Sequence, residues 1–319
     1  MFILRLKSLF VMLLCNFNFV NLLKREVNFM HLLKKPWKIA LGIIPALIIY
    51  CLFSIIPIFI SFYYSFMSWD GFSSMEFIGF ANFIEVFQDK VFWVSVRNNI
   101  IVVLASVFGQ IPIALILALL LNRKVKAAKF FRTVGFMPVV ISTVVISITW
   151  KMIYNSEYGL VNNFLELIGL GFLKQNWLGD PGTVMIAIGV TIIWQFVGLY
   201  FIIFLSALQT VPSEIIEASE LDGATEWQKT RFIILPYIRN IILIAVVLCI
   251  SGSLKTFDLI YVMTSGGPAH SSEVMATYMY DKTFGGLRYG YGSAISVLIF
   301  VFSITMIAIC TKLLSKKET

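Results

Sequence analysis

The chain has 319 residues and a formal net charge of +8, with 59% hydrophobic and only 13% charged residues. A soluble domain carries nearer about 25% charged residues, so this composition indicates an integral membrane protein whose solvent is the bilayer. The basic residues lie in short clusters beside apolar segments, which is typical of membrane topology signals and argues against a nucleic-acid partner. The four cysteines and two histidines show no ligand spacing, so we expect no disulfide framework, metal site or cofactor.

The first 36 residues form a segment of their own, which we expect to be a cytoplasmic or interfacial extension. Residues 9–23 are apolar, but at about 1.5 Å per residue they reach about 22 Å, short of a bilayer core of about 30 Å. Basic residues flank both sides, and no small-residue cleavage site follows. Two interpretations stay open: an interfacial helix, or an upstream extension ahead of a start at Met30.

Six later segments are apolar enough to cross a membrane, for which about 20 residues are needed. They comprise residues 39–66, 100–121, 134–150, 184–208, 241–263 and 291–310. The predicted fold class is therefore an all-α integral membrane protein with six core transmembrane helices. We expect a first helix with its outer loop over residues 37–95, a core over 96–312 and a cytoplasmic tail over 313–319.

Lysine and arginine predict the orientation of these spans, because they concentrate on the cytoplasmic side of a membrane. Most of them precede the first span or lie in residues 123–132, 229–239 and 312–317. Both termini are then expected to be cytoplasmic, and so is the loop over residues 207–239.

That loop is a polar island with five acidic and three basic residues between two apolar segments. Pro212 and Ser213 are residues favoured at helix starts. Gly223 suits a left-handed stop after the helix, and Thr225 with Gln228 has the spacing of a capping box. We expect a helix, a glycine turn and a second helix, which together form a rigid protrusion.

The loop resembles the EAA loop of permease subunits from binding-protein-dependent ABC importers. The residues that carry the resemblance are Glu217, Ala218, Ser219, Asp222, Gly223, Ala224, Leu235 and Pro236. Ser219 stands where the family has alanine and keeps the side chain small. The run 222–224 with Trp227-Gln228 looks like the carbohydrate branch. Further motifs in the same order extend the resemblance over roughly residues 37–311, at residues 77–79, 82–83, 131–132, 137–138, 177–178, 207–209, 257–258 and 264–268.

The resemblance implies a sugar-transport permease of the bacterial cytoplasmic membrane, with coupling helices between spans four and five. Its implied partners are a cytoplasmic ABC ATPase dimer, a second homologous permease and an extracytoplasmic sugar-binding protein. The chain itself would not be an enzyme, because ATP hydrolysis belongs to the ATPase subunit. The sequence agrees, since it holds no Gly-rich phosphate loop ending in Gly-Lys-Ser/Thr.

Polar and aromatic residues within the apolar segments are candidates for a substrate path, because a sugar needs hydroxyl-bonding groups there. The candidates are Gln195, Tyr200, Ser253, Lys255, Thr256 and Asp258. The resemblance to maltose-type permeases places Tyr200, Ser253 and Thr256 near substrate-contacting positions. Lys255 and Asp258 stand three apart and can pair on a helix. Two interpretations of this pair are equally supported: a functional site within the membrane, or charged groups near the outer interface.

Two other classes were weighed against the importer. An ion-gradient-driven secondary transporter would carry carboxylates or histidines within its spans, where only Asp258 qualifies, beside Lys255. A membrane-embedded enzyme would need clustered acids, bases or metal ligands, which the sequence lacks. The turn at residues 264–268 is expected to be a tight outer loop enforced by its glycines and proline, and contact with a binding protein is the alternative.

Overall fold

The computed structural model describes residues 36–122 and 128–315 of the chain. The expected N-terminal extension falls outside these residues apart from Pro36, and so does residue range 316–319 of the expected tail. The described chain divides into two compact units between Ile60 and Ser61. Its elements are helical except for one antiparallel hairpin of β1 (Met67–Ser68) and β2 (Glu76–Phe77), in which Met67 faces Phe77.

The first unit holds one apolar helix interrupted by a wider turn. Helix α2 (Pro36–Tyr50) continues through the π-helical turn η1 (Cys51–Ile55) into α3 (Ile56–Tyr64). Pro57 has no N–H to donate to the preceding turn. The π-helical turn directly before it accommodates the proline, because the N–H of Ile56 donates to the carbonyl of Cys51, five residues back. Residues 42–64 are long and apolar enough to cross a membrane, as expected for the first span.

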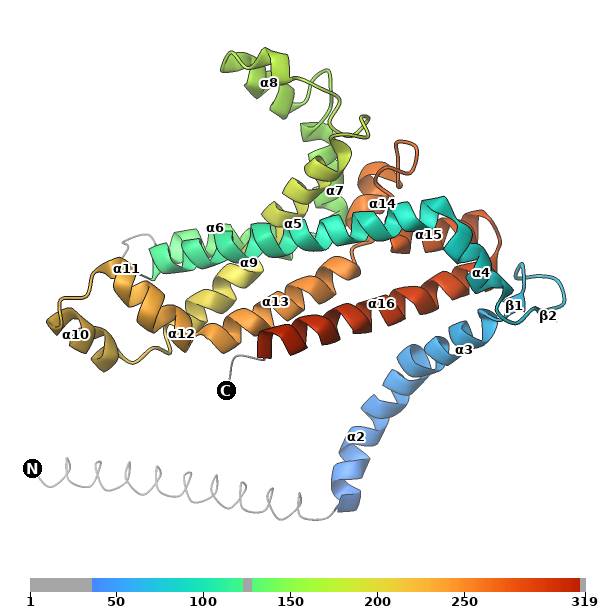
Figure 1. Ribbon diagram of the computed structural model, residues 1–319, viewed down its shortest axis with the longest axis horizontal. Helices are drawn as coiled ribbons and strands as arrows, with labels where there is room; N and C mark the ends of the chain where they lie inside the picture. The colour runs from blue at the N-terminus through green and yellow to red at the C-terminus, as the bar shows by residue number, and fades with distance from the viewer. Residues whose placement is uncertain (1–35, 123–127, 316–319) are drawn as a thin grey trace, which may run out of the picture. The chain divides into compact units, whose positions relative to one another are not determined.

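The second unit begins with the end of α3 and contains all later elements. They are α4 (Ala81–Gln88), α5 (Lys90–Leu121), α6 (Ala128–Val140), α7 (Thr143–Ile153), α8 (Leu160–Leu167), η2 (Gly171–Leu173), α9 (Val184–Leu208), α10 (Ser213–Leu221), α11 (Glu226–Lys229), η3 (Thr230–Ile234), α12 (Leu235–Tyr237), α13 (Arg239–Leu254), α14 (Asp258–Thr264), α15 (Met275–Tyr280), η4 (Asp281–Gly285) and α16 (Tyr289–Ser315). Helices α5, α13 and α16 run side by side, and α9 packs against α5 and α13 (Figure 1).

Four described helices are long and apolar enough to cross a membrane, and two bent helix pairs raise the number to six if each pair counts as one span. The fourth predicted span matches α9 in both bounds, whereas α5 begins ten residues before the predicted second span. The third predicted span is not straight, because α6 and α7 meet at 97°. Pro138 cannot donate within the last turn of α6, and Ser142 takes an extended N-cap conformation before α7.

The fifth predicted span is also wrong as a single helix, since α13 ends at Leu254 and α14 starts at Asp258. The hydroxyl of Ser253 donates to the carbonyl of Cys249, and that of Thr256 donates to Gly252. Such side-chain bonds compete with the helical pattern. Before α13, the helix over residues 226–237 is bent by 68° relative to it.

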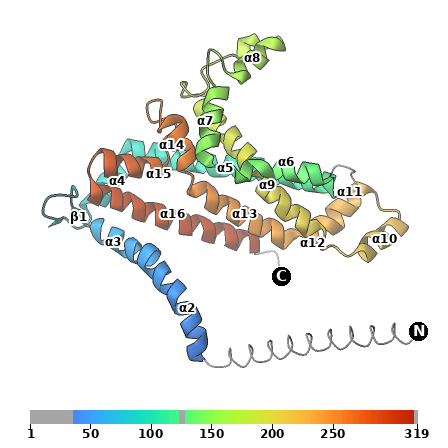
Figure 2. The ribbon, with the colours of Figure 1, turned by 180° about the vertical axis from the view of Figure 1, so that it is seen from behind.

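Most of the short helices lie near the two ends of the long ones, and α8 stands apart from both ends (Figures 1 and 2). Helices α10, α11 and α12, called the loop end below, lie at one end of α9 and α13 in both views (Figures 1 and 2). The hairpin, α4, α14 and α15, called the hairpin end, lie at the opposite end. The second unit therefore presents two distinct polar ends, separated by its apolar helices.

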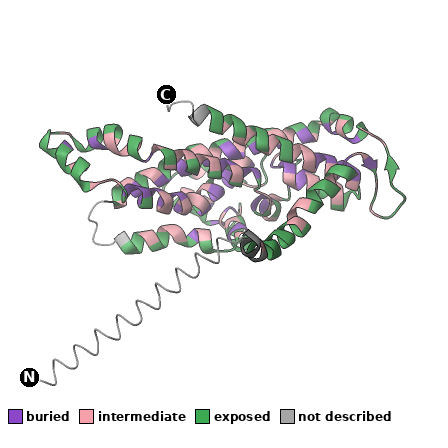
Figure 3. Ribbon diagram, turned by 90° about the horizontal axis from the view of Figure 1, so that it is seen from below, coloured by how far each residue is buried: buried purple, intermediate pink, exposed green. Residues whose placement is uncertain are grey.

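Buried residues lie between the helices of the second unit, and exposed ones cover their outward faces (Figure 3). The backbones of α6 and α9 approach closely where a side chain on Gly198 would collide with the carbonyl oxygen of Gly135. Backbone contact of this kind is how small residues let membrane helices pack. Many exposed side chains on α5 and α16 are large and apolar, for example Phe108 and Phe300, as expected for surfaces that face lipid or another membrane protein.

A partly buried carboxylate, that of Asp89, ties the hairpin end together. Asp89 caps α5 by accepting from the backbone of Val91, and it also accepts hydrogen bonds from the hydroxyls of Tyr278 and Tyr291. Burial alone would raise the pKa of Asp89, but the bonds from the two tyrosines and the backbone outweigh it and lower that pKa below 3.8. The carboxylate stays charged and joins α5 to α15 and α16.

Candidate functional site

A cavity of about 360 Å³ lies between α5, α9 and α13 and is called the path cavity below. Its lining is mainly apolar, with a few polar groups, which is the usual composition of small-molecule sites. It is lined by Gln110, Thr143, Ile192, Phe196, Leu199, Tyr200, Ile203, Leu248, Cys249, Gly252, Ser253, Lys255, Thr256, Phe257, Asp258 and Leu259.

Five of the six path residues predicted from the sequence line this cavity. They are Tyr200, Ser253, Lys255, Thr256 and Asp258. The sixth, Gln195, is buried and does not line the cavity; its Nε2 donates over 3.0 Å to the hydroxyl of Thr143, which does. The structure therefore brings the six residues into one region of the protein.

Gln195 and Gln110 are buried amides inside otherwise apolar helices. Gln110 donates to the carbonyl of Ile192 and accepts a weak bond from the thiol of Cys249, so it joins α5, α9 and α13. The Oε1 of Gln195 is buried without a hydrogen-bond partner among the described residues. An unpaired buried acceptor costs free energy. The same sequence criterion that selects Gln195, an amide within an apolar segment, also selects Gln110.

The expected helical pairing of Lys255 with Asp258 is wrong. Residues 255–257 are not helical, so the three-residue spacing no longer places the two side chains on one helix face. No ion pair joins them in the part of the chain that the structure describes. Both side chains are exposed and both line the path cavity, where they offer one positive and one negative group to a polar solute.

The loop end forms the helix, glycine turn and helix expected from the sequence. Helix α10 starts at Ser213, directly after Pro212. Gly223 has a left-handed φ of +78°, which confirms the predicted glycine stop. The capping box also forms, because Gln228 accepts from the backbone of Thr225 at 2.8 Å and its own N–H donates back to the Thr225 hydroxyl.

Lys229 holds the two short helices together, although no pattern in the sequence points to it. Its side chain is 8% exposed and lies 2.7 Å from a carboxylate oxygen of Glu220, and it also pairs with Glu226. The hydrogen bonds that its ammonium donates to these two carboxylates raise the pKa of Lys229 above 10.5. The polar composition of the loop predicts a solvent-exposed lysine. Its burial becomes evident only from its contacts in the structure.

The outward surface of the loop end combines acids with large apolar side chains. Glu217 and Ala218 are exposed, whereas Ser219 is buried and donates to the carbonyl of Ile216. Leu221, Trp227 and Phe232 are 90%, 69% and 70% exposed. Large exposed apolar side chains among charged ones are a feature that protein contact surfaces often share.

The remaining predicted loop residues shape this protrusion. Asp222 is exposed and follows α10, and Ala224 donates to the carbonyl of Ser219 to close the turn. Leu235 is half-buried, and Pro236 lies in the first turn of α12. Proline is tolerated at that place because the π-helical turn η3 directly before it ends in a wider hydrogen bond from Leu235 to Thr230, as at Pro57.

The fold defines a polytopic, helical membrane protein, and comparison with known proteins gives its family. Residues 110–317 match the family described as binding-protein-dependent transport system inner membrane component. The chain belongs to this family. The predicted family resemblance is thereby confirmed.

Two relatives and one solved structure illustrate the likeness. A probable ABC transporter permease of Pyrococcus horikoshii is 36% identical over 270 residues, which cover 84% of this chain and 92% of the relative. The multiple sugar-binding transport system permease protein MsmF of Streptococcus mutans is 33% identical over 286 residues, covering 89% and 97%. A crystal structure of a bacterial ABC transporter involved in the import of the acidic polysaccharide alginate shares the fold, with a TM-score of 0.78, 24% identity and coverage of 90% and 98%.

Proposed function

We propose that this chain is the permease subunit of an ATP-driven sugar importer and forms the translocation path with a second, homologous permease. The observation that carries the proposal is the loop end, a rigid and partly apolar protrusion in a member of the binding-protein-dependent family. The choice of sugar as substrate class rests on relatives such as MsmF, which is named for sugar transport.

The loop end docks on a cytoplasmic ABC ATPase through the motif residues that are exposed, such as Glu217, Ala218 and Asp222. Exposed Glu217 and Asp222 give it negative charge, and exposed Leu221 and Trp227 give it apolar area. A compact protrusion pinned by Lys229 can transmit a push from the ATPase, because its two helices cannot move independently. ATP hydrolysis takes place on the ATPase, and this chain is a non-catalytic subunit.

The path cavity receives the sugar. Its wall offers aromatic and apolar surface together with hydroxyl, amide, ammonium and carboxylate groups, which suits a solute with both hydroxyls and apolar ring faces. An extracytoplasmic binding protein delivers the sugar at the hairpin end. In this arrangement both termini lie in the cytoplasm, in agreement with the distribution of lysine and arginine.

Reconstitution of the complete importer in proteoliposomes tests the proposal. We expect uptake of at least one radiolabelled sugar that requires ATP and persists when an uncoupler collapses the ion gradient. Deletion of residues 212–221 should abolish ATP-dependent uptake while the chain still inserts. Uptake that fails with the uncoupler at constant ATP would favour an ion-coupled transporter, and full coupling after the deletion would contradict the docking role.

A further inference from the structure

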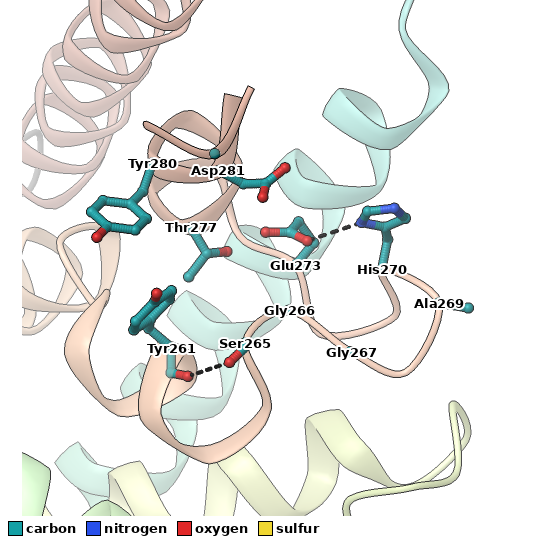
Figure 4. Close-up of a pocket in the computed structure, with 11 residues that line it drawn as sticks. Tyr261, Ser265, Gly266, Gly267, Ala269, His270, Glu273, Thr277, Tyr280 and Asp281 are labelled. Carbon is teal, nitrogen blue, oxygen red and sulfur yellow. Dashed lines mark hydrogen bonds and ion pairs between the residues drawn. The ribbon is translucent and has the colours of Figure 1, made fainter. Parts of the chain in front are cut away.

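A second cavity, of about 410 Å³, lies beneath the 264–273 loop at the hairpin end and is called the Tyr261 cavity below. Its volume falls in the range of small-molecule sites, about 300–1,000 Å³. Its walls come from α14, α15, η4 and the loop that joins α14 to α15, as Figure 4 shows. None of the residues predicted for the substrate path lines it.

The two sides of the Tyr261 cavity differ in chemistry (Figure 4). Tyr261 and Tyr280 form one side, with ring centroids 5.1 Å apart at 68°, and they are 39% and 36% exposed. Glu273 and Asp281 lie on the other side, with Thr277 between the two sides. Partly exposed aromatic side chains therefore stand opposite carboxylate acceptors across a space of ligand size.

The Glu273 carboxylate is built into the wall rather than spread over a surface. Its side chain is only 6% exposed, and the Nδ1 of His270 lies 3.0 Å from one of its oxygens. Gly266 has a φ of +83°, and a side chain there would collide with the Glu273 carboxylate. The amide of Asn98 on α5 fixes the same segment by donating to the carbonyls of Ser271 and Glu273.

The stacked rings of Phe257 and Tyr261 lie between the two cavities. Phe257 lines the path cavity and stacks on Tyr261, with centroids 5.1 Å apart at 17°, and its centroid lies 5.3 Å from that of Tyr280. Phe257 stands in the non-helical segment between α13 and α14. The Tyr261 cavity thus adjoins the path cavity on the side of the hairpin end.

We propose that the Tyr261 cavity is an outer sugar subsite, which holds one pyranose ring before it enters the path cavity. The apolar face of the ring packs on Tyr261 and Tyr280, while Glu273 and Asp281 accept hydrogen bonds from its hydroxyls. This inference rests on the proposed function, because it assigns a second site to the same substrate. It also gives the aromatic contacts of Phe257 a role, since that ring lies between the two sites.

Protection from chemical labelling locates the sugar at this cavity. Ser265 is exposed and lines the Tyr261 cavity, so Ser265→Cys places a thiol at its rim. The parent has its four native cysteines replaced by alanine and must retain uptake. A membrane-impermeant maleimide is applied to the reconstituted complete importer, with maltose, trehalose or raffinose as probes. The matched control is Ser74→Cys, an exposed position at a different cavity of the hairpin end.

We expect a transported probe sugar to slow labelling of Ser265→Cys up to about threefold at twice its dissociation constant, and to leave Ser74→Cys unaffected. Tyr261→Leu and Glu273→Gln should each abolish the protection, and Tyr261→Phe should keep it because the ring remains. If Glu273→Gln fails to assemble with its partners, Asp281→Asn on the same wall replaces it, because that side chain is exposed.

The two proposals fail in different ways. A sugar that is taken up but never protects Ser265→Cys would overturn the outer subsite and leave the importer intact. Protection that survives both Tyr261→Leu and Glu273→Gln would overturn it as well. If the importer with its native cysteines takes up none of the three sugars, and none of them protects Ser265→Cys, the choice of sugar as substrate class is wrong and the subsite is overturned with it.

Discussion

The ammonium of Lys229 lies 2.7 Å from a carboxylate oxygen of Glu220, and the two residues belong to different helices of the loop end. The contact spans the glycine turn at residue 223 and therefore links α10 directly to α11. Its carboxylate partner is 55% exposed, but the lysine is almost fully buried. Loss of the lysine would therefore leave the turn without its main polar link.

Lys229→Gln should loosen this corner and weaken coupling to the ATPase. We expect ATP-dependent uptake to fall severalfold while the amount of inserted chain stays unchanged, because the helices of the loop end are no longer held in one geometry. Uptake and ATPase activity of the reconstituted complex measure the effect. The matched control is Lys174→Gln, since Lys174 also lies 2.7 Å from a carboxylate, that of Glu166, but more exposed and outside the loop end. Equal losses in both variants would contradict this role of Lys229.

Gly223→Val should disturb the loop end through backbone conformation alone. The left-handed φ of +78° costs a residue with a side chain about 1–2 kcal/mol, and nothing lies near enough for a steric clash. Gly223→Asn should be milder, because asparagine adopts this conformation more readily. Association with the ATPase in detergent provides the measurement. Gly42→Ala, which also has open space but lacks a positive φ, should have no effect.

Gln195→Leu should reduce uptake without reducing stability. The leucine removes a buried acceptor that has no partner among the described residues, which offsets the lost bond to Thr143. The hydroxyl of Thr143 is then no longer oriented at the wall of the path cavity. Thermal unfolding and initial uptake rates separate the two effects. Thr149→Val serves as the control, because it removes an exposed hydroxyl that bonds only within its own helix. A clear drop in unfolding temperature for Gln195→Leu would show that Gln195 has a structural role instead.

Asp89→Asn should destabilise the hairpin end by about 1–2 kcal/mol, because hydrogen bonds to a charged acceptor become bonds to a neutral one. The pKa of Asp89 is lowered from 3.8, so its charge contributes fully above that value. The contribution is lost as the pH falls through the lowered pKa. The difference in unfolding temperature between the two purified chains should be constant at neutral pH and shrink below pH 3.8. A difference that is independent of pH throughout would contradict the assignment.

Local signals in the sequence were sufficient for the parts of the fold that depend on neighbours along the chain. The bounds of α9, the start of α10, the left-handed Gly223 and the Thr225–Gln228 capping box all follow from composition and short spacing. The breaks after Val140 and Leu254 did not follow, because an apolar run reads the same whether its helix is straight or bent.

The candidate site likewise combines residues that local sequence signals identify with residues that only the tertiary structure reveals. Polar residues within apolar segments identified five residues of the path cavity, since such groups are conspicuous in a membrane helix. Thr143 and Phe257 were missed because they reach the cavity only through the α6–α7 bend and the break before α14. The buried contact of Lys229 depends on how two short helices fold back on each other, which spacing alone does not define.

Co-purification from mild detergent tests the central claim most directly. We predict that the tagged chain recovers an ABC ATPase and a second membrane permease, and that Glu217→Lys or Gly223→Pro abolishes recovery of the ATPase in a chain that still inserts. Gly42→Ala should leave recovery unchanged. A stable chain that purifies without an ATPase in the presence and absence of nucleotide would contradict the proposed docking function of the loop end.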